Sequence, residues 1–159
     1  MKKQLAVIGI LVFLIFSCKS SAGIIFDDSV PVEQTAWLST ASLGTTSIGK
    51  IIGYNGIAVD WSGVTKMIQI PAGNTVLEWN IDASDYHTHY TGKNILFAYN
   101  YKPQKQYFFA VRVEDEMYGL RVYEFEMGEM FSTSSTFEER FVEFVPFLNV
   151  KSNLKTVLD

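Results

Sequence analysis

Both histidines of the chain lie in one short polar stretch, DASDYHTHY, residues 82–90. In an extended segment, side chains two residues apart point to the same side, so His87 and His89 would present their imidazoles together. Asp82 or Asp85 could supply a third ligand, and zinc accepts such a set while keeping one position open for catalysis. A His-x-His pair in a polar loop is nevertheless common without any metal. We therefore predict a solvated loop and no metal, with His87, His89 and Asp85 as the candidate ligands.

Other catalytic or ion-binding arrangements are not indicated by the residue spacing. A hydrolase triad needs a nucleophile, a base and an orienting group, and the sequence has no Gly-x-Ser-x-Gly segment. Four carboxylates, those of Asp115, Glu124, Glu126 and Glu129, could attract calcium, which takes about six to eight oxygen ligands. Their spacing does not match a calcium loop, and we expect a charged outer face that protects the sheet from aggregation. We predict that the protein is not an enzyme and needs no cofactor.

Aromatic residues are concentrated between residues 97 and 125. Phe97, Tyr99 and Tyr101 would share one face of a strand. Five more follow closely in the sequence: Tyr107, Phe109, Tyr118, Tyr123 and Phe125. Tyr and Trp at exposed positions favour contact with a partner. Two interpretations therefore stay open, namely ordinary core or cross-strand packing and an exposed aromatic patch that binds a partner.

The N-terminus has the three zones of an exported chain. Two lysines precede an apolar run at residues 5–16, and small residues and Cys18 follow. The run is shorter than the ~20 residues that a membrane-spanning helix needs. It predicts a secretory signal peptide instead, and Ala22 or Gly23 would suit an ordinary signal peptidase.

Ile15-Phe16-Ser17-Cys18 resembles the bacterial lipobox. The resemblance implies that Cys18 becomes the first residue of the mature chain and that its sulfur carries the lipid, with acyl chains such as palmitate. Each buried CH₂ contributes ~0.8 kcal/mol, so several acyl chains hold a small domain on a membrane. We therefore expect a membrane-anchored lipoprotein of the bacterial cell envelope, on the periplasmic side or the cell surface.

These features divide the chain into a signal peptide at 1–17, a lipidated N-terminus and tether at 18–34, and a single domain at 35–159. Cys18 is the only cysteine, so the domain can form no internal disulfide and depends on its packed core. Two of the 13 basic residues lie in the signal peptide, which leaves 11 against 17 acidic residues and a net charge of −6. That balance argues against nucleic acid and anionic lipid headgroups as partners, because both favour basic patches.

Short apolar runs separated by turn signals fill the chain from residue 35 onward, which is typical of an all-β sandwich or barrel. We predict a small antiparallel β-sandwich of about seven or eight strands. The expected strands are 35–41, 50–54, 57–61, 64–70, 75–82, 94–101, 106–114 and 118–126, with a polar loop over 82–93.

Three local predictions follow from this pattern. Asn55-Gly56 is a strong hairpin signal, because both positions tolerate a positive φ. Alternation in TVLEWNID turns Leu77, Trp79 and Ile81 toward the core. Residues 23–26, GIIF, are either a first short strand or simply part of the tether.

The C-terminal part allows two interpretations. Residues 135–138 could form a helix capping box, and Phe137, Phe141 and Leu148 fit helical spacing. The segment FVEFVPF also alternates like a strand, and Pro146 would break a helix interior. We predict a short helix across one end of the sandwich, with a last edge strand as the alternative.

Residues 54–79, YNGIAVDWSGVTKMIQIPAGNTVLEW, resemble the PEGA-type domain pattern of a polar-Gly turn between strands and Pro-x-Gly before an apolar strand. Residues 95–113 are similar to the basic turn and aromatic strand of uncharacterised bacterial envelope lipoproteins. The namesake Pro-Glu-Gly-Ala is here Pro71-Ala72-Gly73-Asn74, and Thr75 replaces a common histidine. The resemblance implies a small β-sandwich and no catalytic residues, since turn motifs specify fold more than function.

Together these features predict a lipid-anchored envelope protein that acts as a non-catalytic interaction or accessory module. Its expected partners are the membrane, through the N-terminal lipid, and a protein of the envelope. The alternative is a carrier or sensor that holds a small apolar ligand in a β-barrel or cup. A module should have a filled core and exposed apolar side chains, whereas a carrier needs a cavity lined by the inward aromatic residues.

Overall fold

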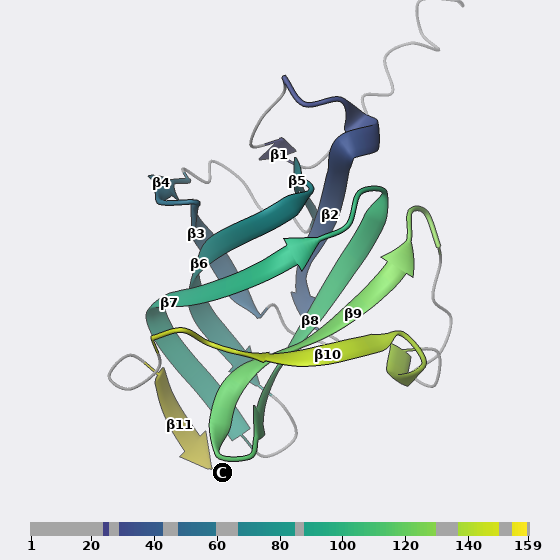
Figure 1. Cartoon of the computed structure of the whole chain (residues 1–159). Coiled ribbons are helices and arrows are strands. Elements are labelled where there is room, and N and C mark those ends of the chain that lie inside the picture. Colours follow the sequence, from purple (N-terminus) through teal and green to yellow (C-terminus); the bar gives the residue numbers. More distant parts are fainter. Residues whose placement is uncertain are drawn as a thin grey trace, which may run out of the picture.

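In the computed structural model, the chain forms two β-sheets that share one hydrophobic core (Figure 1). The structure describes residues 24–25, 29–42, 48–59, 67–84, 88–129, 137–149 and 154–158. Within these residues there are eleven strands, two of them only two residues long. The predicted all-β, sandwich-like class is therefore confirmed.

The larger sheet has six strands in the order β1-β5-β2-β8-β9-β10. Their bounds are β1 (Ile24–Ile25), β5 (Met67–Pro71), β2 (Thr35–Ser42), β8 (Lys105–Glu114), β9 (Met117–Glu126) and β10 (Phe141–Pro146). The pairs β1–β5 and β2–β8 are parallel, so this sheet is mixed and not purely antiparallel as predicted. Turn signals predict hairpins only, whereas these parallel neighbours meet after the chain has crossed between the sheets.

The smaller sheet has five strands in the order β11-β7-β6-β3-β4, all antiparallel. Their bounds are β11 (Leu154–Leu158), β7 (Thr88–Tyr101), β6 (Gly73–Ser84), β3 (Gly49–Tyr54) and β4 (Ile57–Ala58). The predicted hairpin joins β3 to β4, with φ of 49° at Asn55 and 80° at Gly56.

The predicted polar loop over residues 82–93 is wrong. Strand β6 continues to Ser84 and β7 begins at Thr88, so this stretch is the far end of a long hairpin. Tyr90 is buried between less buried neighbours, which is the alternation of a strand. Strand β11 pairs with the other edge of this part of β7. The backbone of this polar stretch therefore has strand partners on both sides, which satisfies its N–H and C=O groups.

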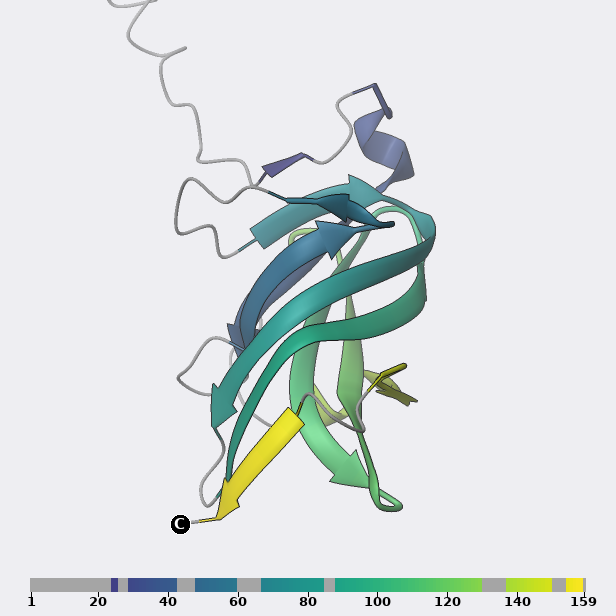
Figure 2. The same ribbon diagram turned by 90° about the vertical axis from the view of Figure 1, so that its left-hand side faces the viewer.

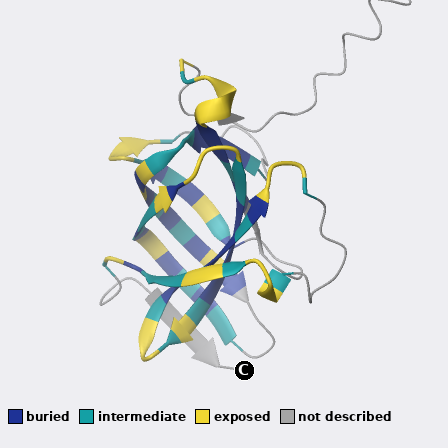
Figure 3. Ribbon diagram, turned by 45° about the vertical axis from the view of Figure 1, so that its right-hand side comes forward, coloured by how far each residue is buried: buried dark blue, intermediate teal, exposed yellow. Residues whose placement is uncertain are grey.

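The core is built by alternate residues of both sheets. Leu77, Trp79 and Ile81 are buried as predicted. The ring of Trp79 meets the ring of Phe109 from the opposite sheet edge-to-face, with centroids 5.7 Å apart. Phe97 makes a similar contact with Phe109 at 5.8 Å. Figure 3 shows buried residues alternating with less buried ones along the strands, and exposed stretches at the ends of the molecule and on β10.

The predicted C-terminal helix is wrong over residues 141–146, where the alternative edge strand is confirmed, whereas Phe137 and Glu138 just before this strand are helical. Strand β10 pairs with β9 at the sheet edge, and Pro146 is its last residue. Residues 135 and 136 of the expected capping box lie outside the described residues. The close approach of the two strands requires Gly119, because a Cβ there would lie 2.3 Å from the carbonyl oxygen of Val145.

After β10 the chain passes from one sheet to the other. The amide of Phe147 donates to the carbonyl of Tyr118 in β9, and the amide of Leu148 donates to the carbonyl of Leu96 in β7. The side chain of Asn149 then accepts a hydrogen bond from the amide of Leu96 at 2.8 Å and donates one to the carbonyl of Asn94 at 2.7 Å. This segment ties the sheets together along one side.

The start of the domain gathers at one end of the molecule. Ile24 and Ile25 pair with Ile68 and Gln69, so GIIF contains a short first strand. Strand β1, the 3₁₀ turn η1 (Val32–Gln34) and the β3–β4 hairpin lie at the same end, and the β8–β9 turn lies at the other (Figures 1 and 2). We call the former the β1 end.

Candidate functional site

Three tyrosines form a cluster between the two sheets. Tyr99 and Tyr101 lie two residues apart on β7, so they share a face, and Tyr107 comes from β8 in the other sheet. Their rings meet edge-to-face with centroids 5.0–5.7 Å apart. Tyr101 and Tyr107 are buried and Tyr99 is half-buried. We call these three residues the tyrosine cluster.

Carboxylates lie beside two of the three hydroxyl groups. Tyr107 Oη donates to Glu124 Oε2 at 3.1 Å and accepts a hydrogen bond from the amide of Lys102 at 2.9 Å. Burial, together with the charges of Glu143 and Glu124, raises the pKa of Tyr99 to about 12. Burial likewise raises the pKa of Tyr107 far above its usual range. Both hydroxyl groups are therefore neutral hydrogen-bond donors at physiological pH.

The hydroxyl of Tyr101 differs from the other two. It is buried and has no hydrogen-bond partner among the described residues. Its pKa is raised well above the ordinary value by burial and by the neighbouring Tyr99 and Tyr107. The indole Nε1 of Trp79 is also buried without such a partner. A buried donor without a partner lowers the free energy of unfolding by about 1–3 kcal/mol. Each of these two groups is therefore expected to destabilise the core.

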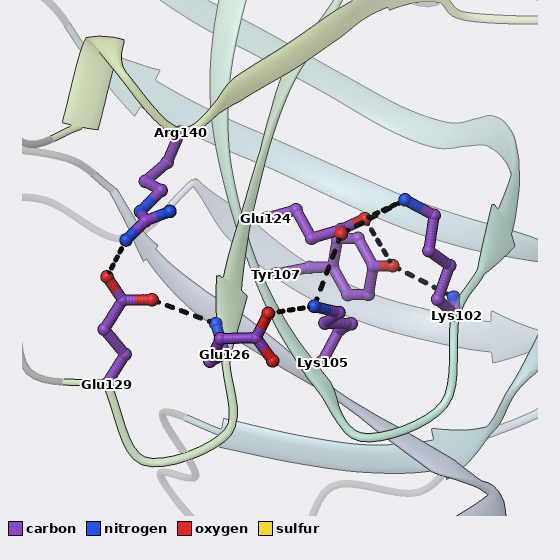
Figure 4. A network of polar contacts seen from close by, with 7 residues as sticks. All are labelled: Lys102, Lys105, Tyr107, Glu124, Glu126, Glu129 and Arg140. Carbon is purple, nitrogen blue, oxygen red and sulfur yellow. Dashed lines mark hydrogen bonds and ion pairs between the residues drawn. The ribbon is translucent and has the colours of Figure 1, made fainter.

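An ion-pair network borders the tyrosine cluster (Figure 4). Lys102 Nζ lies 3.0 Å from the carboxylate of Glu124, and Lys105 lies between Glu124 and Glu126. Further along, Arg140 pairs with Glu129.

The carboxylates considered for calcium are thus divided among cations. Glu124, Glu126 and Glu129 each pair with a lysine or arginine, and Asp115 lies at the β8–β9 turn at the opposite end of these strands. Within the residues that the structure covers, no group of three or more His, Cys, Asp or Glu side chains could hold a metal ion. The arrangement supports a charged surface.

Of the candidate zinc ligands, the structure brings two together. His89 Nε2 lies 3.3 Å from Asp82 Oδ1 across the β6–β7 hairpin, and both side chains are well exposed. His87 and Asp85 lie outside the described residues, as does Cys18, the predicted lipid attachment site.

The eight aromatic residues singled out in the sequence are mainly interior. Six of them are buried: Phe97, Tyr101, Tyr107, Phe109, Tyr123 and Phe125. Tyr99 and Tyr118 are half-buried and pack against the core. The positions of all eight support core and cross-strand packing over an exposed aromatic patch.

A second aromatic cluster was not expected from the sequence. Phe108 and Phe125 point away from the main core and are covered by Phe137 and Phe141, which lie in and just before β10. The guanidinium of Arg121 lies 4.7 Å from the ring centre of Phe141. The signal was present in residues 107–111, YFFAV, where five consecutive apolar residues put apolar side chains on both faces of β8 and so require cover on both sides.

Comparison of the chain with protein-family models, curated proteins and solved structures finds no match. Among the described residues, no helix has the length and apolar character needed to cross a membrane.

Proposed function

We propose that this chain is a lipid-anchored protein of the bacterial cell envelope whose domain acts as a non-catalytic interaction or accessory module. The lipobox-like residues 15–18 support the anchor, and the PEGA-like stretch at 54–79 agrees with a display role. One structural observation carries the choice of module over carrier, namely that aromatic rings from the two sheets meet in the middle of the core.

The ring contacts cross the interior from one sheet to the other. Phe109 of the larger sheet touches Trp79 and Phe97 of the smaller one, and Tyr107 touches Tyr101. Rings at these separations are in direct contact, so they fill the space that a carried ligand would occupy. Such a domain offers its outer surfaces to partners, where large apolar side chains including Leu148 are exposed.

The anchor is tested by membrane fractionation of matched variants of the full chain. Cys18→Ser removes the sulfur that would carry the lipid, whereas Ser17→Ala keeps a small residue before the cysteine. We expect the Ser17→Ala protein to stay in the membrane fraction with an acylated N-terminal peptide in mass spectrometry. The Cys18→Ser protein should lose both properties, and retention of both by it would overturn the proposal.

The module is tested by crosslinking in cells that produce a C-terminally tagged full chain, with mass spectrometry of the purified products. We expect one dominant envelope protein, crosslinked in the wild type and lost when exposed apolar residues such as Leu148 are changed to serine. Co-purification of a lipid or small molecule without any protein partner would favour the carrier.

The carrier remains the second candidate because of two atoms. Trp79 Nε1 and Tyr101 Oη are buried donors without a partner among the described residues. An amphipathic ligand with two acceptor atoms could satisfy both if the core opened. Solvent extraction of the purified protein, followed by mass spectrometry, separates the candidates, because only a carrier yields a stoichiometric ligand.

A further inference from the structure

We propose that the β1 end of the domain rests on the lipid surface that holds Cys18, with Val32 and Ile57 in contact with it. This inference depends on the proposed lipid attachment. It adds an orientation and a contact surface that the attachment alone does not specify.

The first observation is how early the folded domain begins. Strand β1 starts at Ile24 and pairs with Ile68 of β5, so six residue steps along the chain separate Cys18 from the first strand of the domain. Six residue steps at about 3.3–3.6 Å each span about 20 Å at most. Because the sulfur of Cys18 would sit at the membrane surface, β1 stays within that distance of the lipid headgroups.

The second observation is the size of the domain. Strand β7 has 14 residues, and at about 3.3 Å per residue its path is about 45 Å long. The tether is therefore shorter than half of that path. Since β1 lies at one end of the molecule (Figures 1 and 2), the tether pulls that end toward the membrane and leaves the β8–β9 turn remote.

The third observation is which side chains the β1 end exposes. Ile57, next to the β3–β4 turn, is 69% exposed, and Val32 in η1 is 57% exposed. Figure 3 shows η1 and β4 as exposed elements at this end. With more than half of each side chain exposed, neither is covered by a neighbouring element. An apolar side chain next to a bilayer gains by entering its interfacial region.

Charge argues against electrostatic attraction as the cause of this contact. The mature chain has a net charge of −6, and the exposed Glu33 lies in η1 beside Val32. The contact would therefore depend on the lipid anchor and on the apolar side chains, with the carboxylate of Glu33 at the level of the headgroups and water.

The test uses the absence of any other cysteine. In the purified lipoprotein the sulfur of Cys18 is blocked by its thioether, so one introduced thiol is the only labelling site. The variants Val32→Cys and Ile57→Cys report on the β1 end. Their controls, Val113→Cys and Met117→Cys, lie by the β8–β9 turn at positions that are 44% and 47% exposed. Each protein carries an environment-sensitive fluorophore in vesicles of phosphatidylethanolamine and phosphatidylglycerol with brominated acyl chains.

We expect blue-shifted and quenched emission at Val32 and Ile57, and neither effect at Val113 and Met117. Equal quenching at all four positions, or none at Val32 and Ile57, would overturn the inference. Mass spectrometry of the N-terminal peptide separates the two proposals. Missing acyl chains would refute the anchor and the orientation together, whereas acylated protein with unquenched probes would refute the orientation alone.

Discussion

At the scale of single residues, two buried tyrosines next to each other have opposite hydrogen-bonding situations. Tyr107 Oη has both a donor and an acceptor partner, whereas Tyr101 Oη has no partner among the described residues. The two rings are in contact, and both side chains are buried. They form a matched pair for measuring what one hydroxyl group contributes.

We predict that Tyr107→Phe lowers the free energy of unfolding by about 1–3 kcal/mol, because Glu124 and the amide of Lys102 both lose a partner. Tyr101→Phe should leave that free energy unchanged or raise it, because it removes an unsatisfied donor. Urea unfolding followed by circular dichroism measures both. A loss of similar size in Tyr101→Phe would show that its hydroxyl has a partner, such as a bound ligand.

Stability should also fall at alkaline pH because of Tyr99. Its pKa is raised to about 12 by burial and then by the charges of Glu143 and Glu124, against about 10 in an unfolded chain. A raised pKa gives a contribution that is fully present below pH 10 and is lost as the pH rises toward 12. Unfolding measured through this interval should show a shallower fall for Tyr99→Phe than for the wild type, and identical slopes would contradict the prediction.

At the scale of elements, the β9–β10 pair depends on one glycine. A Cβ at Gly119 would meet the carbonyl oxygen of Val145 at 2.3 Å and the ring of Phe144 at 2.7 Å. We predict that Gly119→Ala lowers the free energy of unfolding by about 2–4 kcal/mol, because β10 must move away from β9. Val142→Ala is the control on the exposed side of β10, with an expected change within about 0.5 kcal/mol.

At the edge of β7, the side chain of Asn149 makes the two backbone hydrogen bonds that a neighbouring strand would otherwise make. Asn149 accepts from the amide of Leu96 and donates to the carbonyl of Asn94. Asn149→Ala removes both bonds, and Asn149→Asp keeps only the acceptor. We predict faster amide hydrogen exchange at Leu96 in the alanine variant than in the aspartate variant, with the wild type slowest. Equal protection in all three would show that the neighbouring backbone alone closes this edge.

How far the sequence predicts these elements depends on how local their signal is. Alternation predicts the inward face of Leu77, Trp79 and Ile81, and Asn55-Gly56 predicts its hairpin, because both are properties of adjacent residues. Strand β10 fits a helix and a strand equally well, and only its pairing with β9 decides between them. The contact of Tyr99 with Glu143 could not be predicted for the same reason, since it joins two sheets whose relative placement is not encoded locally.

At the scale of the whole molecule, the two sheets should unfold together because Phe109 packs on Trp79 and Phe97 of the opposite sheet. We predict that Phe109→Ala lowers the free energy of unfolding by about 3–5 kcal/mol. Tryptophan fluorescence and far-ultraviolet circular dichroism should still report one coincident transition. Two separate transitions would show that the sheets are independent units.

The position of β2 has a consequence for the order of events after synthesis. This strand is made early, yet it lies inside the larger sheet between β5 and β8, and Leu38 pairs in parallel with Tyr107. It cannot acquire both neighbours until most of the domain has been made, and pairing between such distant segments is slow. This slow pairing is compatible with the export that we propose, because a chain that stays unfolded can be threaded through an export channel before its central sheet is complete.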